Sequence, residues 1–202
     1  MRTTSLSKIP PIGLSFWILK VLATTLGDLS GDFLSVTLHL GYSLALAAAV
    51  LAMLVLLVAN IRSRRLRPLH FWALMVAISA VGAEISDTLS RGSGWGTAFT
   101  GLVLFAGLFA TLLSWGICRG LPALGFIADR RDEVWFWAAA LLGNSLGSVL
   151  GDWLGDRWGL GFAATSALYA ALLALLWWGR HTTRIDRRLL FWAAFVPSRF
   201  PF

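Results

Sequence analysis

Six long apolar runs restrict what this chain can fold into. They cover residues 12–34, 40–60, 70–90, 98–118, 134–154 and 162–179, and only 13% of the whole sequence is charged. A soluble domain is about a quarter charged, whereas a helix of about 20 apolar residues crosses the hydrocarbon core of a bilayer. We therefore predict an all-α integral membrane protein with six transmembrane helices, surrounded by a lipid bilayer, in which residues 1–202 form a single transmembrane domain.

The basic residues lie mainly in alternate loops. Arginine and lysine gather at the N-terminus and in the 61–69, 119–133 and 180–188 loops, while the intervening loops hold only Arg91 and Arg157. Loops rich in lysine and arginine stay in the cytoplasm, so we expect the N-terminus to be cytoplasmic. Because the net charge of +7 comes largely from these loops, we expect no nucleic-acid partner.

The sequence also contains an internal repeat. The pair Phe-Trp occurs four times, starting at residues 16, 71, 136 and 191. Four columns of identical residues follow the first three pairs: Gly27, Gly82 and Gly147; Asp32, Asp87 and Asp152; Leu34, Leu89 and Leu154; Gly41, Gly96 and Gly161. Such self-similarity is the signature of a repeat architecture. We predict three tandem helical hairpins of the same topology, at about 14–62, 69–120 and 134–182, followed by a short stub of a truncated fourth repeat at 189–202.

The stretch from Phe16 to Asp32, FWILKVLATTLGDLSGD, resembles a bacterial family of uncharacterised membrane-anchored proteins that is built from four copies of a repeat of unknown function. This resemblance extends from Lys8 to about Val196. It implies a multi-pass protein of the bacterial inner membrane with no soluble domain, and it implies no particular activity. A complete fourth hairpin is expected from the family, whereas this sequence has the tail 197–202 in its place.

The repeated aspartates are the first candidates for a functional site. Asp32, Asp87 and Asp152 each lie sixteen residues past a Phe, about 24 Å along a helix, so we expect them at one depth near the outer surface. Asp28 and Glu84 lie about one turn before the first two, on the same helix face. Acids inside spans usually face a bundle interior or a watery cavity. We predict that these five bind a proton or a cation such as Mn²⁺, Mg²⁺ or Ca²⁺; alternatively, they only end the helices at the water interface.

Polar residues deeper in the runs suggest a path toward these acids. Lys20 is the only cation well inside a run, and five further polar residues lie eight or nine positions past a Phe: Thr24, Thr25, Ser79, Asn144 and Ser145. We predict a polar path lined by these residues, with Lys20 as a gate or as the charge partner of an acid. The alternatives are that Lys20 extends to the inner interface and that the other five residues hydrogen-bond between helices.

The repeated glycines are predicted to serve helix packing. Small residues let membrane helices approach closely, and we assign this role to Gly27, Gly82, Gly147 and Gly151. An alternative is that glycine breaks a helix and opens backbone groups to a cation.

No catalytic constellation is evident in the sequence. Residues 143–147 match the pattern Gly-x-Ser-x-Gly, but they lie in an apolar run with no histidine in a later span to act as a base. We therefore expect no enzyme activity and no cofactor, and the identity of any metal stays open. The leading hypothesis is a transporter of a small cation, either a divalent metal or a proton. The alternative is a non-transporting scaffold or partner subunit that forms a homo-oligomer or joins another membrane subunit, a class that includes a truncated inactive copy.

Overall fold

The computed structural model describes residues 7–39, 41–63, 65–120, 127, 129–157, 159–182 and 186–199, without the side chains of Tyr42, Arg157, Phe162, Arg180 and His181. These residues form seven α-helices and contain no strand, so the described chain is all-α. The basic residues Arg2, Arg64 and Arg184 and the last three residues of the predicted stub, 200–202, lie outside the described residues.

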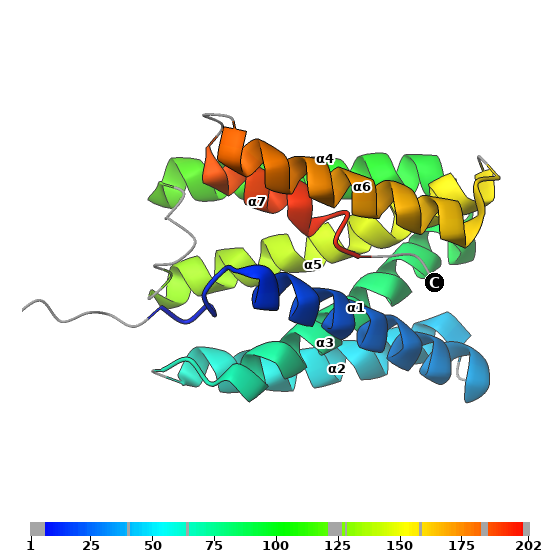
Figure 1. The fold of residues 1–202 in the computed structure, drawn as a ribbon. Coiled ribbons are helices and arrows are strands. Elements are labelled where there is room, and N and C mark those ends of the chain that lie inside the picture. Colours follow the sequence, from blue (N-terminus) through cyan, green and yellow to red (C-terminus); the bar gives the residue numbers. More distant parts are fainter. Residues whose placement is uncertain are drawn as a thin grey trace, which may run out of the picture.

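The helices form three hairpins and one single helix (Figure 1). The first helices of the hairpins are α1 (Leu14–Asp32), α3 (Pro68–Asp87) and α5 (Arg130–Asp152), and the second helices are α2 (Gly41–Arg62), α4 (Gly96–Arg119) and α6 (Gly161–Thr182). The single helix α7 (Arg187–Phe195) belongs to the fourth repeat. The second helix of each hairpin packs on the first helix of the next, so that α2 covers α3, α4 covers α5 and α6 covers α7. We call α1, α3, α5 and α7 the inner helices.

Four of these helical segments are long and apolar enough to cross a membrane: Ser43–Arg62, Pro68–Gly92, Gly96–Arg119 and Arg130–Asp156. Two of the six predicted spans do not reach that standard in the described residues. In α6 the apolar stretch Ala163–Gly179 is shorter, with 17 residues. In α1, which has 19 residues, Lys20 and Asp28 interrupt the apolar sequence.

Local sequence signals explain where several helices begin. Pro68 occupies the first turn of α3, where its missing N–H is not needed. The side chain of Asp186 accepts a hydrogen bond from the backbone N–H of Arg188 over 2.8 Å and caps α7. Asp129 caps α5, and Asp132 and Glu133 in the first turn of that helix complement its dipole.

Each repeated aspartate is the last residue of its α-helix. A five-residue π-helical turn follows in all three hairpins, over Phe33–Thr37, Thr88–Gly92 and Trp153–Arg157. The chain then turns through two residues with left-handed backbone, which are His39 and Gly41, Gly94 and Gly96, and Gly159 and Gly161. The last column of the repeat holds glycine at φ between +70° and +74°, a conformation that residues with a side chain rarely adopt.

The four Phe-Trp pairs close into a ring at the N-terminal ends of the inner helices. Each phenylalanine contacts the tryptophan of the neighbouring repeat, with ring centroids 5.5 Å apart for Phe16 and Trp72, 5.0 Å for Phe71 and Trp137, 5.9 Å for Phe136 and Trp192, and 5.5 Å for Phe191 and Trp17. The four phenylalanines are each at most 4% exposed. The stub of the fourth repeat therefore completes a pseudo-fourfold aromatic layer in the core.

Candidate functional site

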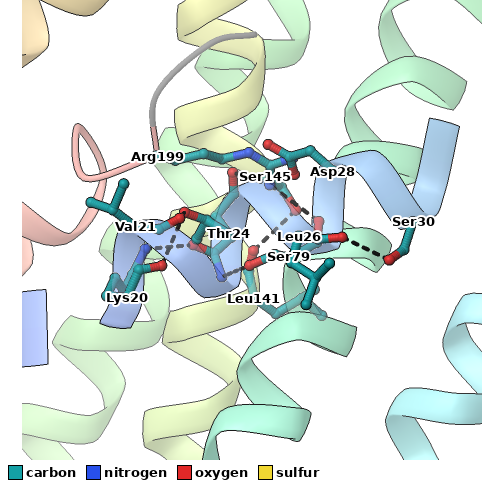
Figure 2. Close-up of polar contacts among 11 residues, drawn as sticks. Lys20, Val21, Thr24, Leu26, Asp28, Ser30, Ser79, Leu141, Ser145 and Arg199 are labelled. Atoms are coloured by element: carbon teal, nitrogen blue, oxygen red, sulfur yellow. Dashed lines mark hydrogen bonds and ion pairs between the residues drawn. The ribbon is translucent and has the colours of Figure 1, made fainter. Parts of the chain in front are cut away.

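A buried polar cluster lies beyond the aromatic ring, between α1, α3, α5 and the turn that follows α7. We call it the central polar cluster, and it comprises Lys20, Asp28, Ser79, Asn144 and Arg199 (Figure 2). Lys20, Ser79 and Asn144 are completely buried, and Arg199 is 2% exposed. Burying charges is costly unless they are paired and hydrogen-bonded. Arg199 is paired with Asp28, and Lys20 donates a hydrogen bond to the amide of Asn144.

Arg199 makes three interactions within the cluster. Its Nη1 donates to the backbone carbonyls of Ser79 over 3.2 Å and Asn144 over 3.1 Å, and its Nη2 forms an ion pair with the carboxylate of Asp28. A guanidinium suits this position because it presents several donors in a fixed plane. Arg199 thereby joins three inner helices at one level.

Lys20 contacts the same cluster from the side of the aromatic ring. Its Nζ donates to Asn144 Oδ1 over 3.0 Å and lies 4.1 Å from the centre of the Phe195 ring. The alternative that Lys20 reaches the inner interface is wrong, because its side chain is 0% exposed. Asn144 also donates from Nδ2 to Ser79 Oγ over 3.2 Å, so its amide bridges α1 and α3.

The other predicted path residues do not join this network. Thr24 Oγ1 donates to the carbonyls of Lys20 and Val21 in its own helix, and Ser145 Oγ donates to the carbonyl of Leu141 over 3.0 Å. Thr25 is half-buried. Ser79 and Asn144 therefore form the hydrogen bonds between helices that the alternative predicted, while the hydroxyls of Thr24 and Ser145 donate to carbonyls of their own helices.

The predicted outer acids fall into separate environments. Arg91 Nη1 lies 3.4 Å from Asp87 Oδ1, and Arg91 Nη2 lies 3.3 Å from Asp152 Oδ2 and 3.8 Å from Asp156 Oδ2. One arginine therefore gathers acids from the ends of α3 and α5. Asp28 pairs with Arg199 instead, and Asp32 is exposed.

Glu84 is the most deeply buried of these acids. It is 1% exposed, and its Oε2 has no hydrogen-bond partner. A Cβ added at Gly31 would lie 3.2 Å from Glu84 Oε1, so the carboxyl group is enclosed between α1 and α3. Within the described part of the chain, no group of three or more His, Cys, Asp or Glu residues is placed to hold a metal ion.

The glycines that were predicted to serve packing lie inside the inner helices, and three of them lie at close contacts between chain segments. A Cβ at Gly27 would lie 2.5 Å from Ser79 Cβ, and one at Gly147 would lie 2.6 Å from the carbonyl oxygen of Val196. At Gly82 it would lie 3.1 Å from Arg199 Nη1. Gly151 is buried in α5. All four glycines lie inside regular α-helix, so the structure gives no helix break at these positions.

Arg199 is the site residue that the sequence interpretation missed. It lies eight residues past Phe191, which is the column that holds Thr24, Ser79 and Asn144 in the other repeats. Extending the gap-free register of the repeat into the tail would have identified it.

A second buried ion pair ties the N-terminal segment to α5. Lys8 Nζ lies 2.5 Å from Glu133 Oε2 and donates to the carbonyl of Ile61 over 3.2 Å, while Asn60 Nδ2 donates to Glu133 Oε1 over 3.0 Å. Lys8 and Glu133 are 7% and 2% exposed. This group holds the N-terminal segment, the end of α2 and the start of α5 together.

These features define an all-helical membrane protein built from tandem hairpin repeats around a buried charged cluster. Its sequence matches the family described as "Repeat of Unknown Function (DUF347)" twice, over residues 15–66 and 70–119. The chain belongs to this family, and the two matches coincide with its first two hairpins. No curated protein and no solved structure matches the chain.

Proposed function

We propose that this chain is a multi-pass transporter of a small cation, with the proton as the favoured cargo. The observation that carries the proposal is the central polar cluster. Four of its five members are at most 2% exposed, and it lies among helices that include two long enough to span a membrane. Ionisable groups in such positions are costly and mark ion pathways and proton relays in membrane proteins. The proposal is of a transporter and not of an enzyme.

The polar groups follow one direction along the inner helices. Lys20, Arg199 and Asp28 lie four, eight and twelve positions past their phenylalanines, about one helical turn apart. Glu84 and then Asp87, Asp152 and Arg91 continue toward the far end. The aromatic ring closes the opposite end. In the proposed cycle the cation enters from the acidic end while the aromatic ring closes the opposite end.

The pairing of acids with bases favours a proton over a metal ion. Arg199 places a positive charge where a divalent cation would have to pass, and like charges repel strongly in a medium of low dielectric constant. A proton needs no open channel of oxygen ligands. Binding of a proton to Asp28 removes the charge that holds Arg199, and this change lets the inner helices separate.

The charges of the loops and the family resemblance support a location and an orientation for this proposal. We assign the protein to the bacterial inner membrane with six spans and a cytoplasmic N-terminus, because the described basic residues Arg62, Arg119 and Arg187 lie at the end of the bundle that carries the aromatic ring. The acids then face the outer side. A scaffold or partner-subunit role, alone or within a homo-oligomer, stays the second candidate, and the uncovered face of α1 described below is the observation that favours it.

Reconstitution into vesicles tests the proposal. Vesicles loaded with a pH-sensitive dye would receive an imposed pH gradient, and parallel vesicles would carry a Mn²⁺-sensitive dye. We expect proton entry above that of empty vesicles, a fall to the empty-vesicle rate in Asp28→Asn, and native entry in Asp156→Asn, because Asp156 is exposed at 63%. Equal proton entry in native and Asp28→Asn vesicles at matched folded incorporation would overturn the proposal.

A further inference from the structure

The outer face of α1 differs from the same face of the other inner helices. Leu22, Leu26 and Leu29 lie six, ten and thirteen positions past Phe16 and are 59%, 56% and 58% exposed. The matching residues of α5 are Leu142, Leu146 and Val149. Leu146 and Val149 are 4% and 0% exposed, and Leu142 packs against the core. The two stripes have nearly the same side chains in the same register, but only one of them is covered.

The helix α4 covers the α5 stripe, and it does so through glycines. A Cβ at Gly101 would lie 3.5 Å from Val149 Cγ1, and one at Gly107 would lie 3.5 Å from Leu142 Cδ2. These two glycines therefore bring α4 into van der Waals contact with both ends of the stripe. In the same way α2 covers α3, where Val81 and Glu84 occupy the matching positions and are each 1% exposed.

The second helices share a buried stripe of their own. Four and eight positions past each turn glycine lie residues that are at most 5% exposed: Ala45 and Ala49 in α2, Thr100 and Leu104 in α4, and Thr165 and Tyr169 in α6. A helix that covers an inner helix in this fold thus has two buried residues four positions apart, which are both alanine in α2 and include the large Tyr169 in α6.

A groove continues the uncovered face toward the aromatic ring. It has a volume of about 630 Å³ and lies between α1, which contributes Leu14, Trp17 and Val21, and the facing helices α6 and α7. Figure 1 shows α1 at the front of the bundle, below α6 and α7. The groove lies beside the place that a second helix following α7 would take in the pattern set by the other three hairpins.

We propose that this face of α1 binds an apolar transmembrane helix of the α4 type, antiparallel to α1 and supplied by another polypeptide of the same repeat family. The small residues of that helix contact Leu22 and Leu29 as Gly101 and Gly107 contact Leu142 and Val149. The internal comparison with α4 on α5 carries the proposal, because it gives the direction, the register and the side-chain sizes of the occupant.

Energy transfer in vesicles tests this docking surface. The full chain, carrying a donor fluorophore, would be reconstituted with an acceptor-labelled peptide of residues 96–119 as the probe. We expect saturable one-to-one transfer above the level of randomly mixed labels. Binding should weaken at least tenfold with the peptide Gly101→Leu/Gly107→Leu, a change that cannot affect folding of the chain. The chain variant Leu22→Trp/Leu29→Trp should weaken it similarly, whereas the matched control Leu102→Trp, on an exposed face of α4, should not.

Three results would overturn the proposal. Transfer at the random level means that lipid covers the face. Equal binding by the native and glycine-substituted peptides means that the contact is not the one α4 makes. Transfer between donor- and acceptor-labelled copies of the full chain that is lost in the variant Leu22→Trp/Leu29→Trp means that a second copy occupies the face.

Discussion

The ion pair between Arg199 and Asp28 allows a quantitative test of the central polar cluster. Removing one member of a buried pair costs about 3–5 kcal/mol, because the other charge stays behind without a partner. Asp28 has 19% of its side chain exposed, and water partly rehydrates it, so we expect the lower end, about 3 kcal/mol, for Arg199→Met. Asp28→Asn should cost about 2 kcal/mol, because Arg199 keeps its two carbonyl acceptors.

The double variant Arg199→Met/Asp28→Asn separates this coupling from the individual losses. We expect its cost to fall short of the sum of the single costs by about 2 kcal/mol, which is within the range for residues in direct contact. The assay is reversible unfolding in mixed micelles, followed by the fluorescence of the 11 tryptophans. Costs that add to within about 0.5 kcal/mol would refute the pairing. Arg91 and Asp156, an exposed pair at 3.8 Å, supply the control and should couple by less than about 1 kcal/mol.

Three further predictions concern packing, turns and the N-terminal segment. Gly27→Ala should destabilise the fold by about 1–3 kcal/mol, because the added Cβ forces α1 away from Ser79. Gly179→Ala, where a Cβ meets nothing within 4 Å, should not destabilise it. Unfolding in mixed micelles compares the two variants, and equal costs would contradict the packing role. Gly41→Ala should destabilise the fold by about 1–2 kcal/mol through its left-handed backbone alone, because a Cβ there has no atom within 4 Å. His39→Gly should not destabilise the turn. The same unfolding assay checks both variants. Lys8→Met should cost about 3 kcal/mol by leaving Glu133 buried, and Glu133→Gln in the same chain should recover part of that loss; no recovery would show that the ion pair does not hold the segment.

The register of the repeat predicted the arrangement of the inner helices well. The Phe-Trp pairs that mark each repeat in the sequence are the residues that meet in the aromatic ring, and the aspartate column marks the ends of three α-helices. These features depend on helical period and repeat symmetry, which a sequence carries directly. The turn glycines behave likewise, since their column coincides with positive φ.

The partners of the charged residues were harder to predict. The sequence predicted Lys20 to be a gate or the charge partner of an acid. In the structure the amide of Asn144 accepts its hydrogen bond, and Arg199 pairs with Asp28. The sequence predicted the three repeated aspartates at one depth near the outer surface. The structure adds that Arg91 contacts Asp87 and Asp152, while Asp32 is exposed. Such pairings depend on side-chain reach across helices, which register alone does not determine.

The role of Arg199 was not predicted, although the register of the repeat places it in the same column as Ser79 and Asn144. Because the last apolar run is short and meets Pro197, residues 197–202 were interpreted as a tail, and Arg199 was included in it. In the structure the backbone N–H of Ser198 still donates to the carbonyl of Ala194 over 3.1 Å, so the chain keeps enough helical path past α7 to place Arg199 in the polar layer.

The most direct test of the account compares two substitutions of Asp28 in the proton-flux assay. Asp28→Glu keeps a group that binds a proton and pairs with Arg199, and Asp28→Asn keeps the size but loses both properties. The account predicts measurable proton entry in Asp28→Glu and entry at the empty-vesicle rate in Asp28→Asn, with equal folded protein in both. Proton entry that is the same in the two variants, whether native or absent, would contradict the claim that Asp28 carries the proton.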